Sequence, residues 1–96
     1  DSEDGAVMPT EFSIVDAYPN PFNAFTNIVF NLPQQGYVSG SVFDLQGRNV
    51  LVLVEGNLQP GVHSVLLDGN MLSTGVYVVK INSGNKVSTQ KIVLLK

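Results

Sequence analysis

Few side chains in this sequence have the chemistry from which a catalytic or metal-binding site could be built. His63 is the only histidine, and cysteine is absent. A nucleophilic site needs a base beside its nucleophile, and a zinc site needs several nitrogen, sulfur or oxygen ligands held together. In the stretch GVHSVLL, His63 alternates with Val65 and Leu67, so we expect its ring to face the core as a packing residue. The sequence therefore predicts no catalytic histidine, no zinc site and no cofactor.

The carboxylates offer no acid–base pair either. The N-terminal stretch DSEDG has the composition of a calcium loop but lacks the spaced ligands and the final glutamate of that motif. Asp44 and Asp68 each stand at the end of an expected strand, where a carboxylate commonly caps a turn. Glycoside hydrolysis needs two carboxyl groups across a cleft, which a small all-strand domain does not offer. We expect the chain not to be an enzyme.

Composition argues against two further classes of partner. The chain has 96 residues, a net charge of −3, and five Lys and Arg residues that are spread singly. Nucleic acid requires a clustered basic surface, so we expect no nucleic-acid binding. No apolar run reaches the ~18 residues that a membrane-spanning helix needs, so we expect no membrane insertion.

The residue pattern predicts one folded domain, residues 12–96, behind an acidic linker or lead-in, residues 1–11. Short apolar stretches alternate with turns rich in glycine, proline and asparagine, and no segment has a convincing helical period. The seven expected strands are 12–18, 25–32, 37–44, 49–55, 61–68, 76–82 and 86–96. This spacing favours an all-β fold, an immunoglobulin-like antiparallel β-sandwich, because a single sheet would leave one apolar face bare. The expected inward-facing residues are Ile14, Ile28, Phe30, Leu32, Val42, Val65, Leu67, Tyr77, Val79 and Ile81.

The first strand is followed by a stiff corner, YPNPFN. Pro19 and Pro21 fix their own φ angles and push the residues before them into extended geometry. We expect this corner to turn the first strand into the second, with Asn20 and Asn23 closing turns onto nearby backbone.

A second turn motif, DLQGR, follows the third strand. Asp44 suits the first position of a tight turn, and Gly47 suits a position with positive φ. Arg48 is spaced to pair with Asp44. We expect all three residues to serve the structure of the turn.

Six stretches occur in one order: YPNPFN, an Ile-x-Phe strand ending in LPQQG, VFDLQGRNV, PGVHSVLLDG, STGVYVVKINSG and the final KIVLLK. Together they make residues 16–96 resemble the C-terminal sorting domain of the type IX (Por) secretion system of Bacteroidetes-type bacteria. The chain departs from the family pattern at three places: Ala24 replaces a proline, Gly40 a common leucine, and Leu67 a tryptophan. The pattern is also similar to the immunoglobulin-like domain of the flagellar hook-cap protein, which does not sort cargo.

The resemblance implies that the folded domain is itself a secretion signal and that it has no catalytic site. It implies an N-terminal cargo domain that crosses the inner membrane on a signal peptide and reaches the cell surface or medium through the periplasm. The implied partners are the outer-membrane type IX translocon and a surface peptidase that removes the domain. The residues implied for sorting and recognition are Lys91, Ile92, Val93, Leu94, Leu95 and Lys96. We expect them to form an edge strand whose unpaired backbone is open to strand addition by a receptor.

Two other interpretations remain open from the sequence. The chain could be an accessory β-sandwich module of a secreted enzyme, either a spacer or a polysaccharide-binding domain built on its exposed aromatic residues. It could also be an assembly domain like that of the hook cap, which would need an array of partner subunits.

Overall fold

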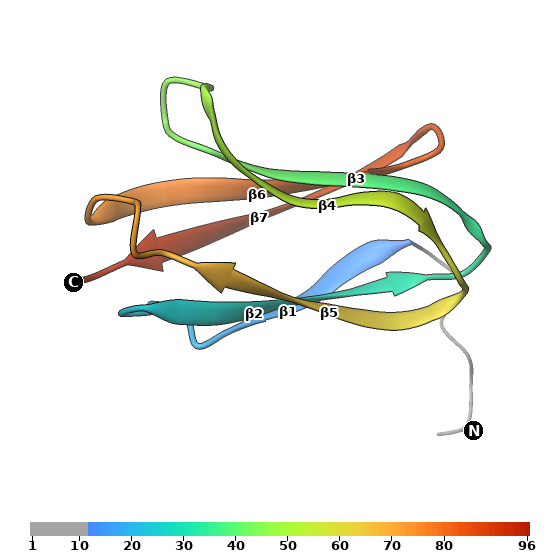
Figure 1. Ribbon diagram of the computed structural model, residues 1–96, viewed down its shortest axis with the longest axis horizontal. Helices are drawn as coiled ribbons and strands as arrows, with labels where there is room; N and C mark the ends of the chain where they lie inside the picture. The colour runs from blue at the N-terminus through green and yellow to red at the C-terminus, as the bar shows by residue number, and fades with distance from the viewer. Residues whose placement is uncertain (1–11) are drawn as a thin grey trace.

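A computed structural model of the protein describes residues 12–96, which form seven strands (Figure 1). The expected linker, residues 1–11, lies outside the described residues. The strands are β1 Ser13–Tyr18, β2 Phe25–Leu32, β3 Gly36–Phe43, β4 Asn49–Leu58, β5 Gly61–Asp68, β6 Gly75–Ser83 and β7 Lys86–Leu94. All pairings between these strands are antiparallel. The prediction of an all-β fold is confirmed.

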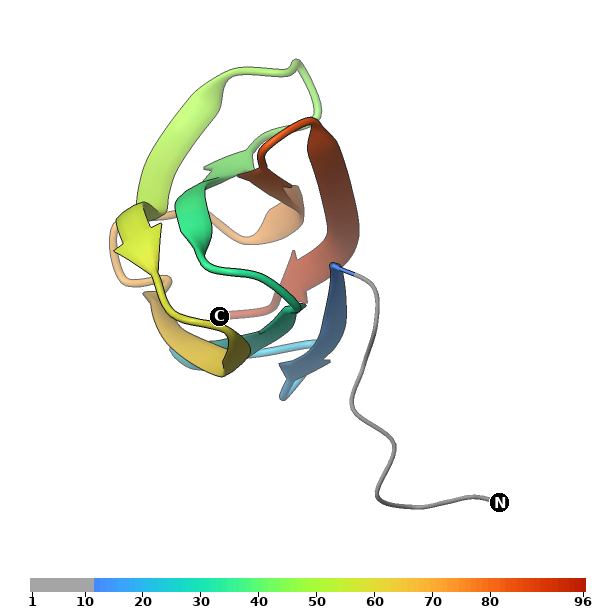
Figure 2. The same cartoon turned by 90° about the vertical axis from the view of Figure 1, so that its right-hand side faces the viewer.

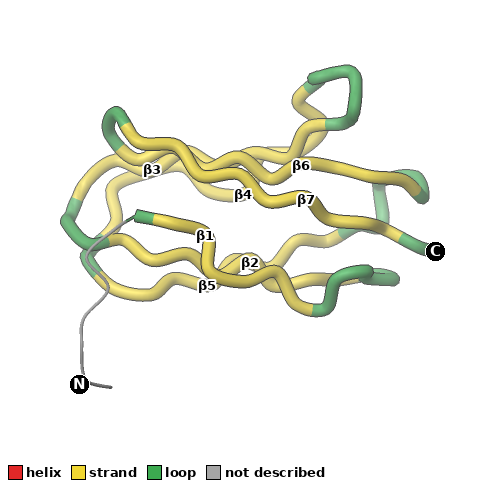
Figure 3. Tube along the Cα trace, turned by 180° about the vertical axis from the view of Figure 1, so that it is seen from behind, coloured by secondary structure: helices red, strands yellow, loops and turns green. Residues whose placement is uncertain are grey.

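Two sheets face each other as the layers of a sandwich, seen from behind in Figure 3. One sheet has three strands in the order β1-β2-β5, and the other has four in the order β4-β3-β6-β7. Strand alternation explains the layering. In β2, for example, Thr26, Ile28, Phe30 and Leu32 are buried, whereas Phe25 and Asn27 are exposed and Val29 is partly buried, because successive side chains of a strand point to opposite faces.

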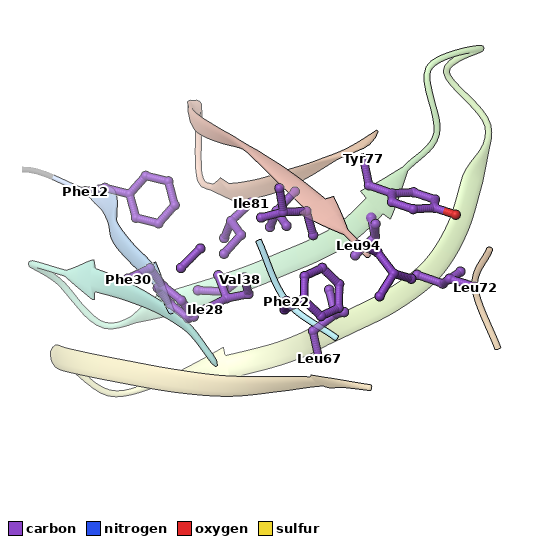
Figure 4. Packing of buried hydrophobic residues seen from close by; sticks show 14 of the residues in the cluster. Phe12, Phe22, Ile28, Phe30, Val38, Leu67, Leu72, Tyr77, Ile81 and Leu94 are labelled. Atoms are coloured by element: carbon purple, nitrogen blue, oxygen red, sulfur yellow. The ribbon is translucent and has the colours of Figure 1, made fainter. Parts of the chain in front are cut away.

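The core lies between the two sheets and consists mainly of apolar side chains (Figure 4), with the polar residues Thr26 and Asn31 also buried. Of the ten side chains expected to face inward, eight are buried, and the other two, Ile14 and Val65, are partly buried and pack against the same cluster. The buried eight are Ile28, Phe30, Leu32, Val42, Leu67, Tyr77, Val79 and Ile81. Sequence alternation therefore identified the inner face of both sheets.

Two strand ends differ from the prediction by more than one residue. β4 continues to Leu58 instead of ending at residue 55, because Gly56 and Leu58 still pair with Val38 and Gly36 of β3. β7 ends at Leu94 instead of running to residue 96, because the last residues leave the sheet and bond to two other segments, described below.

The two ends of the sandwich carry different loops, and its two sides bring together different pairs of strands. The corner before β2, the β3–β4 turn, the β5–β6 loop and the C-terminus all lie at one end, opposite the start of β1 and the β6–β7 turn (Figure 1). Seen along the strands, β1 lies beside β7 on one side and β4 meets β5 on the other (Figure 2). The contact between β1 and β7 positions the candidate site, because it brings the proline corner that follows β1 next to the C-terminal part of β7.

Candidate functional site

His63 faces inward from β5 and acts as a packing residue. Its ring stacks on Phe30, with ring centroids 5.4 Å apart, and its Nε2 atom lies 2.7 Å from the carbonyl oxygen of Gln59. Among residues 12–96, no group of three or more His, Asp or Glu side chains could hold a metal ion. The same residues contain no helix that is long and apolar enough to cross a membrane.

The β3–β4 turn has the geometry that its sequence predicts. Gly47 has a φ of 85°, and its N–H donates to the carbonyl of Asp44 at 3.0 Å. The Asp44 Oδ1 atom accepts the backbone N–H groups of Gln46 and Arg48 at 2.9 and 3.0 Å, and Arg48 Nε donates to Oδ2 at 2.8 Å. The backbone N–H of Arg48 is the main cause that lowers the pKa of Asp44 below its ordinary value. Every one of these contacts is internal to the turn.

The proline corner, residues 19–22, contacts the last strand instead of closing on itself. Asn20 Nδ2 donates to the carbonyl of Lys91 at 3.1 Å, and Asn20 Oδ1 accepts the N–H of Val93 at 3.0 Å. The expected turn onto nearby backbone is wrong for Asn20, because both polar atoms of its side chain bond to residues more than seventy positions away. A single amide thus pairs with β7 much as a neighbouring strand would.

Phe22 extends this pairing along β7. Its N–H donates to the carbonyl of Val93 at 2.9 Å, and its carbonyl accepts the N–H of Leu95 at 2.8 Å, so that Phe22 and Leu94 form a parallel bridge. The Phe22 ring is 2% exposed and lies between Leu67 and Leu94 in the core (Figure 4). The ring therefore holds the corner in place while the backbone closes the edge of β7.

The terminal segment, residues 91–96, is held from several directions. Ile92 and Leu94 are fully buried, whereas Leu95 is 53% exposed. The backbone N–H of Lys96 donates to Thr74 Oγ1 at 3.0 Å, and its Nζ atom donates to the carbonyl of Asn70 at 2.9 Å. The segment is thus tied to the β5–β6 loop as well as to β6 and the proline corner.

The expectation that the edge of the terminal segment would be open is wrong. The carbonyl of Lys91, the N–H and carbonyl of Val93 and the N–H of Leu95 are all bonded to Asn20 or Phe22. A receptor strand could pair at this edge only by displacing the corner. Farther along β7, the Ser88 hydroxyl accepts the N–H of Ile14 from β1 at 3.0 Å.

The structure therefore joins two of the three stretches that the sequence singled out. Pro19, Asn20 and Pro21 lie against the terminal segment, whereas the turn containing Asp44, Gly47 and Arg48 lies at the same end but is bonded within itself (Figure 1). Sequence reasoning missed the roles of Thr74 and Asn70, which hold Lys96. Neither stands in a pattern that could have indicated it, because each contact depends on chain closure in three dimensions.

Residues 16–95 match the protein family described as the secretion system C-terminal sorting domain. The chain belongs to this family. Neither a curated protein nor a solved structure matches the chain. A sorting domain of this family is the C-terminal signal for type IX secretion, which delivers proteins to the cell surface or the medium. The family is one of non-catalytic sorting signals, and nothing favours an accessory module.

Proposed function

We propose that this sorting domain directs a cargo protein, joined to its N-terminal side, from the periplasm through the outer-membrane type IX translocon. The terminal segment, residues 91–96, is the part that the translocon contacts. A surface peptidase then removes the domain, which has no catalytic activity and no cofactor of its own. The observation that carries the proposal is the family match, which extends to residue 95 and so includes all of the terminal segment except Lys96.

The burial of side chains in the terminal segment determines which changes can test its role in recognition. Truncation after Gln90 would remove Ile92 and Leu94, whose side chains are fully buried. Losing a large buried aliphatic side chain costs about 2–5 kcal/mol, and the total stability of a small domain is about 5–15 kcal/mol. The truncated domain would unfold, and loss of export would then say nothing about recognition.

The experiment uses exposed positions instead. A fluorescent passenger with an N-terminal Sec signal peptide is fused to residues 1–96 and expressed in a bacterium with a type IX translocon. The variants are the intact chain, a Lys91→Ala and Lys96→Ala double substitution, and a matched Lys86→Ala control. We expect the intact and control fusions to be exported and the double variant to remain in the periplasm. Circular dichroism of each purified domain checks that it is folded.

Each result bears on a different part of the proposal. An intact fusion that stays inside the cell would refute the sorting function. If a folded double variant is exported like the intact chain, the terminal lysines are not contacted and the proposed role of residues 91–96 is refuted. Mass spectrometry of the exported passenger tests the peptidase step, since removal of the domain shortens the fusion.

A further inference from the structure

Four of the five positively charged side chains of this chain lie in its C-terminal part, the fifth being Arg48. Residues 69–96 contain four lysines, Lys80, Lys86, Lys91 and Lys96, and no Asp or Glu. The acidic side chains of the described residues lie elsewhere, at Asp16, Asp44, Glu55 and Asp68. The hairpin of β6 and β7 is thus basic, although the whole chain has a net charge of −3.

Two of these lysines share the outer face of the four-stranded sheet. Val79 and Ile92 fill the core from β6 and β7 with no exposed surface, so the residues next to them point outward. Lys91 pairs across the strands with Val78, and Lys80 lies two residues farther along β6 on the same face. Lys80 and Lys91 are exposed and are both neighbours of the partly buried Val78.

Neither lysine is neutralised within the described residues. The ion pair there joins Arg48 to Asp44, in the β3–β4 turn. The Lys80 ammonium lies 6.0 Å from the centroid of the Phe43 ring, a contact that leaves its charge intact. Glu55 is on the same face but two strands away from β6. Desolvation is the main cause that raises the pKa of Tyr37, and the negative charge of Glu55 raises it further.

The closed edge makes this face the accessible side of the terminal segment. The carbonyl of Lys91, the N–H and carbonyl of Val93 and the N–H of Leu95 are bonded to the proline corner, and the side chains of Ile92 and Leu94 point into the core. Toward solvent the segment presents Lys91 and Val93 on the outer face of the sheet, followed by the exposed Leu95 and Lys96. A receptor that binds this segment in the folded domain, without displacing the corner, can reach it from the outer face of the sheet.

We propose that the outer face of β6 and β7, centred on Lys80, Val78 and Lys91, docks onto an acidic protein surface of the export machinery. This inference rests on the proposed function and names the chemistry of its partner. Carboxylates on the receptor pair with the two ammonium groups, and Val78, which neighbours both lysines, supplies apolar contact. An anionic membrane is the less suitable partner, because stable binding there uses about four to eight clustered basic residues, and this face has two.

The test compares charge reversal with charge retention in the same passenger fusion. Lys80→Glu with Lys91→Glu reverses both charges of the face, whereas Lys80→Arg with Lys91→Arg keeps them. Lys86→Glu is the matched control, because Lys86 is an exposed lysine at the opposite end of β7. We expect the Glu pair to lower export at least about tenfold and the Arg pair and Lys86→Glu to leave it within about twofold. Melting curves verify that all variants fold.

Sedimentation with vesicles containing phosphatidylglycerol separates the two kinds of partner. We expect the purified domain not to sediment with them. Vesicle binding that disappears in the Glu pair would overturn the protein-surface proposal in favour of a lipid. Export of the folded Glu pair at the intact level would also overturn it while leaving the sorting function standing. Failure of the intact fusion to be exported would refute the sorting function, and this inference with it.

Discussion

The sharpest test of the closed edge is the substitution Asn20→Ala. The Asn20 side chain makes two hydrogen bonds to β7, to the carbonyl of Lys91 and from the N–H of Val93, and both are exposed to water. A hydrogen bond between uncharged groups contributes about 0.5–1.5 kcal/mol to stability. Allowing for their exposure, we expect Asn20→Ala to lower the free energy of unfolding by about 1–2 kcal/mol. In a domain of this size that corresponds to a fall of roughly 5–12 °C in melting temperature.

The neighbouring Asn23 provides the control, since its exposed side chain makes no hydrogen bond to another described residue. Chemical denaturation of both Ala variants gives the stability difference, and amide hydrogen exchange reports on the edge directly. We expect the Val93 amide to exchange faster in Asn20→Ala and to be unchanged in Asn23→Ala. If the two variants agree within about 0.3 kcal/mol and Val93 stays equally protected, the corner does not hold the edge of β7.

Three other substitutions test local features of the fold. Gly47→Val should lower the free energy of unfolding by about 1–2 kcal/mol from backbone strain alone, since Gly47 has a φ of 85° and open space around it. Gly36→Val, in equally open space but without positive φ, should lower it by less than about 0.5 kcal/mol in the same denaturation assay. Gly40→Ala should cost about 1–3 kcal/mol, because its Cβ atom would lie 2.8 Å from Val54 Cγ1, and adding Val54→Ala should recover part of the loss. The lowered pKa of Asp44 means that its ionised form stabilises the fold above the ordinary value of 3.8 and that this contribution is lost as pH falls below it. Asp44→Asn should therefore be less stable at neutral pH and lose less stability on acidification, and parallel pH profiles for the two proteins would contradict this.

Strand positions could be predicted from the sequence because they depend on local alternation. In β2, residues Ile28, Phe30 and Leu32 specify the buried face without reference to any other strand, and all three are buried. The β3–β4 turn was predictable for the same reason, since Asp44 and Gly47 interact within four residues. A structural feature whose contacts all lie within a few residues can therefore be predicted from the local sequence.

The closed edge could not be predicted in this way. Asn20 is a good turn residue by its chemistry, and nothing beside it in the sequence indicates that its partners are Lys91 and Val93. The correct pairing requires knowing that β1 lies beside β7 and that the chain then crosses from one sheet toward the other. The prediction of an open edge failed because it treated the last strand as if only its sheet neighbour existed.

Gly40 shows how a departure from the family pattern can be accommodated by the fold. A side chain there would meet Val54 and Ile81, which already fill the space above the β3 backbone. Val54 lies next to an irregularity in the β3–β4 register, where one residue of β4 is left without a partner. We infer that this bulge brings Val54 over the glycine, so that the branched side chain of β4 occupies the volume that a larger residue of β3 would otherwise take.

The closed edge of β7 and the exposed outer face of β6 and β7 together meet two requirements of a sorting signal. The domain must avoid pairing with other copies of itself, and it must remain accessible to its receptor. An open edge strand pairs indiscriminately with other edge strands, and on the proposed route through the periplasm many copies of the domain would meet one another. Asn20 and Phe22 occupy the backbone groups through which the terminal segments of two copies could join. Under the proposed recognition, Lys80 and Lys91 remain available on the outer face, and like charges repel a second copy while attracting an acidic receptor. In this proposal the proline corner contributes to the sorting signal by closing the edge of β7, and the receptor does not have to contact the corner.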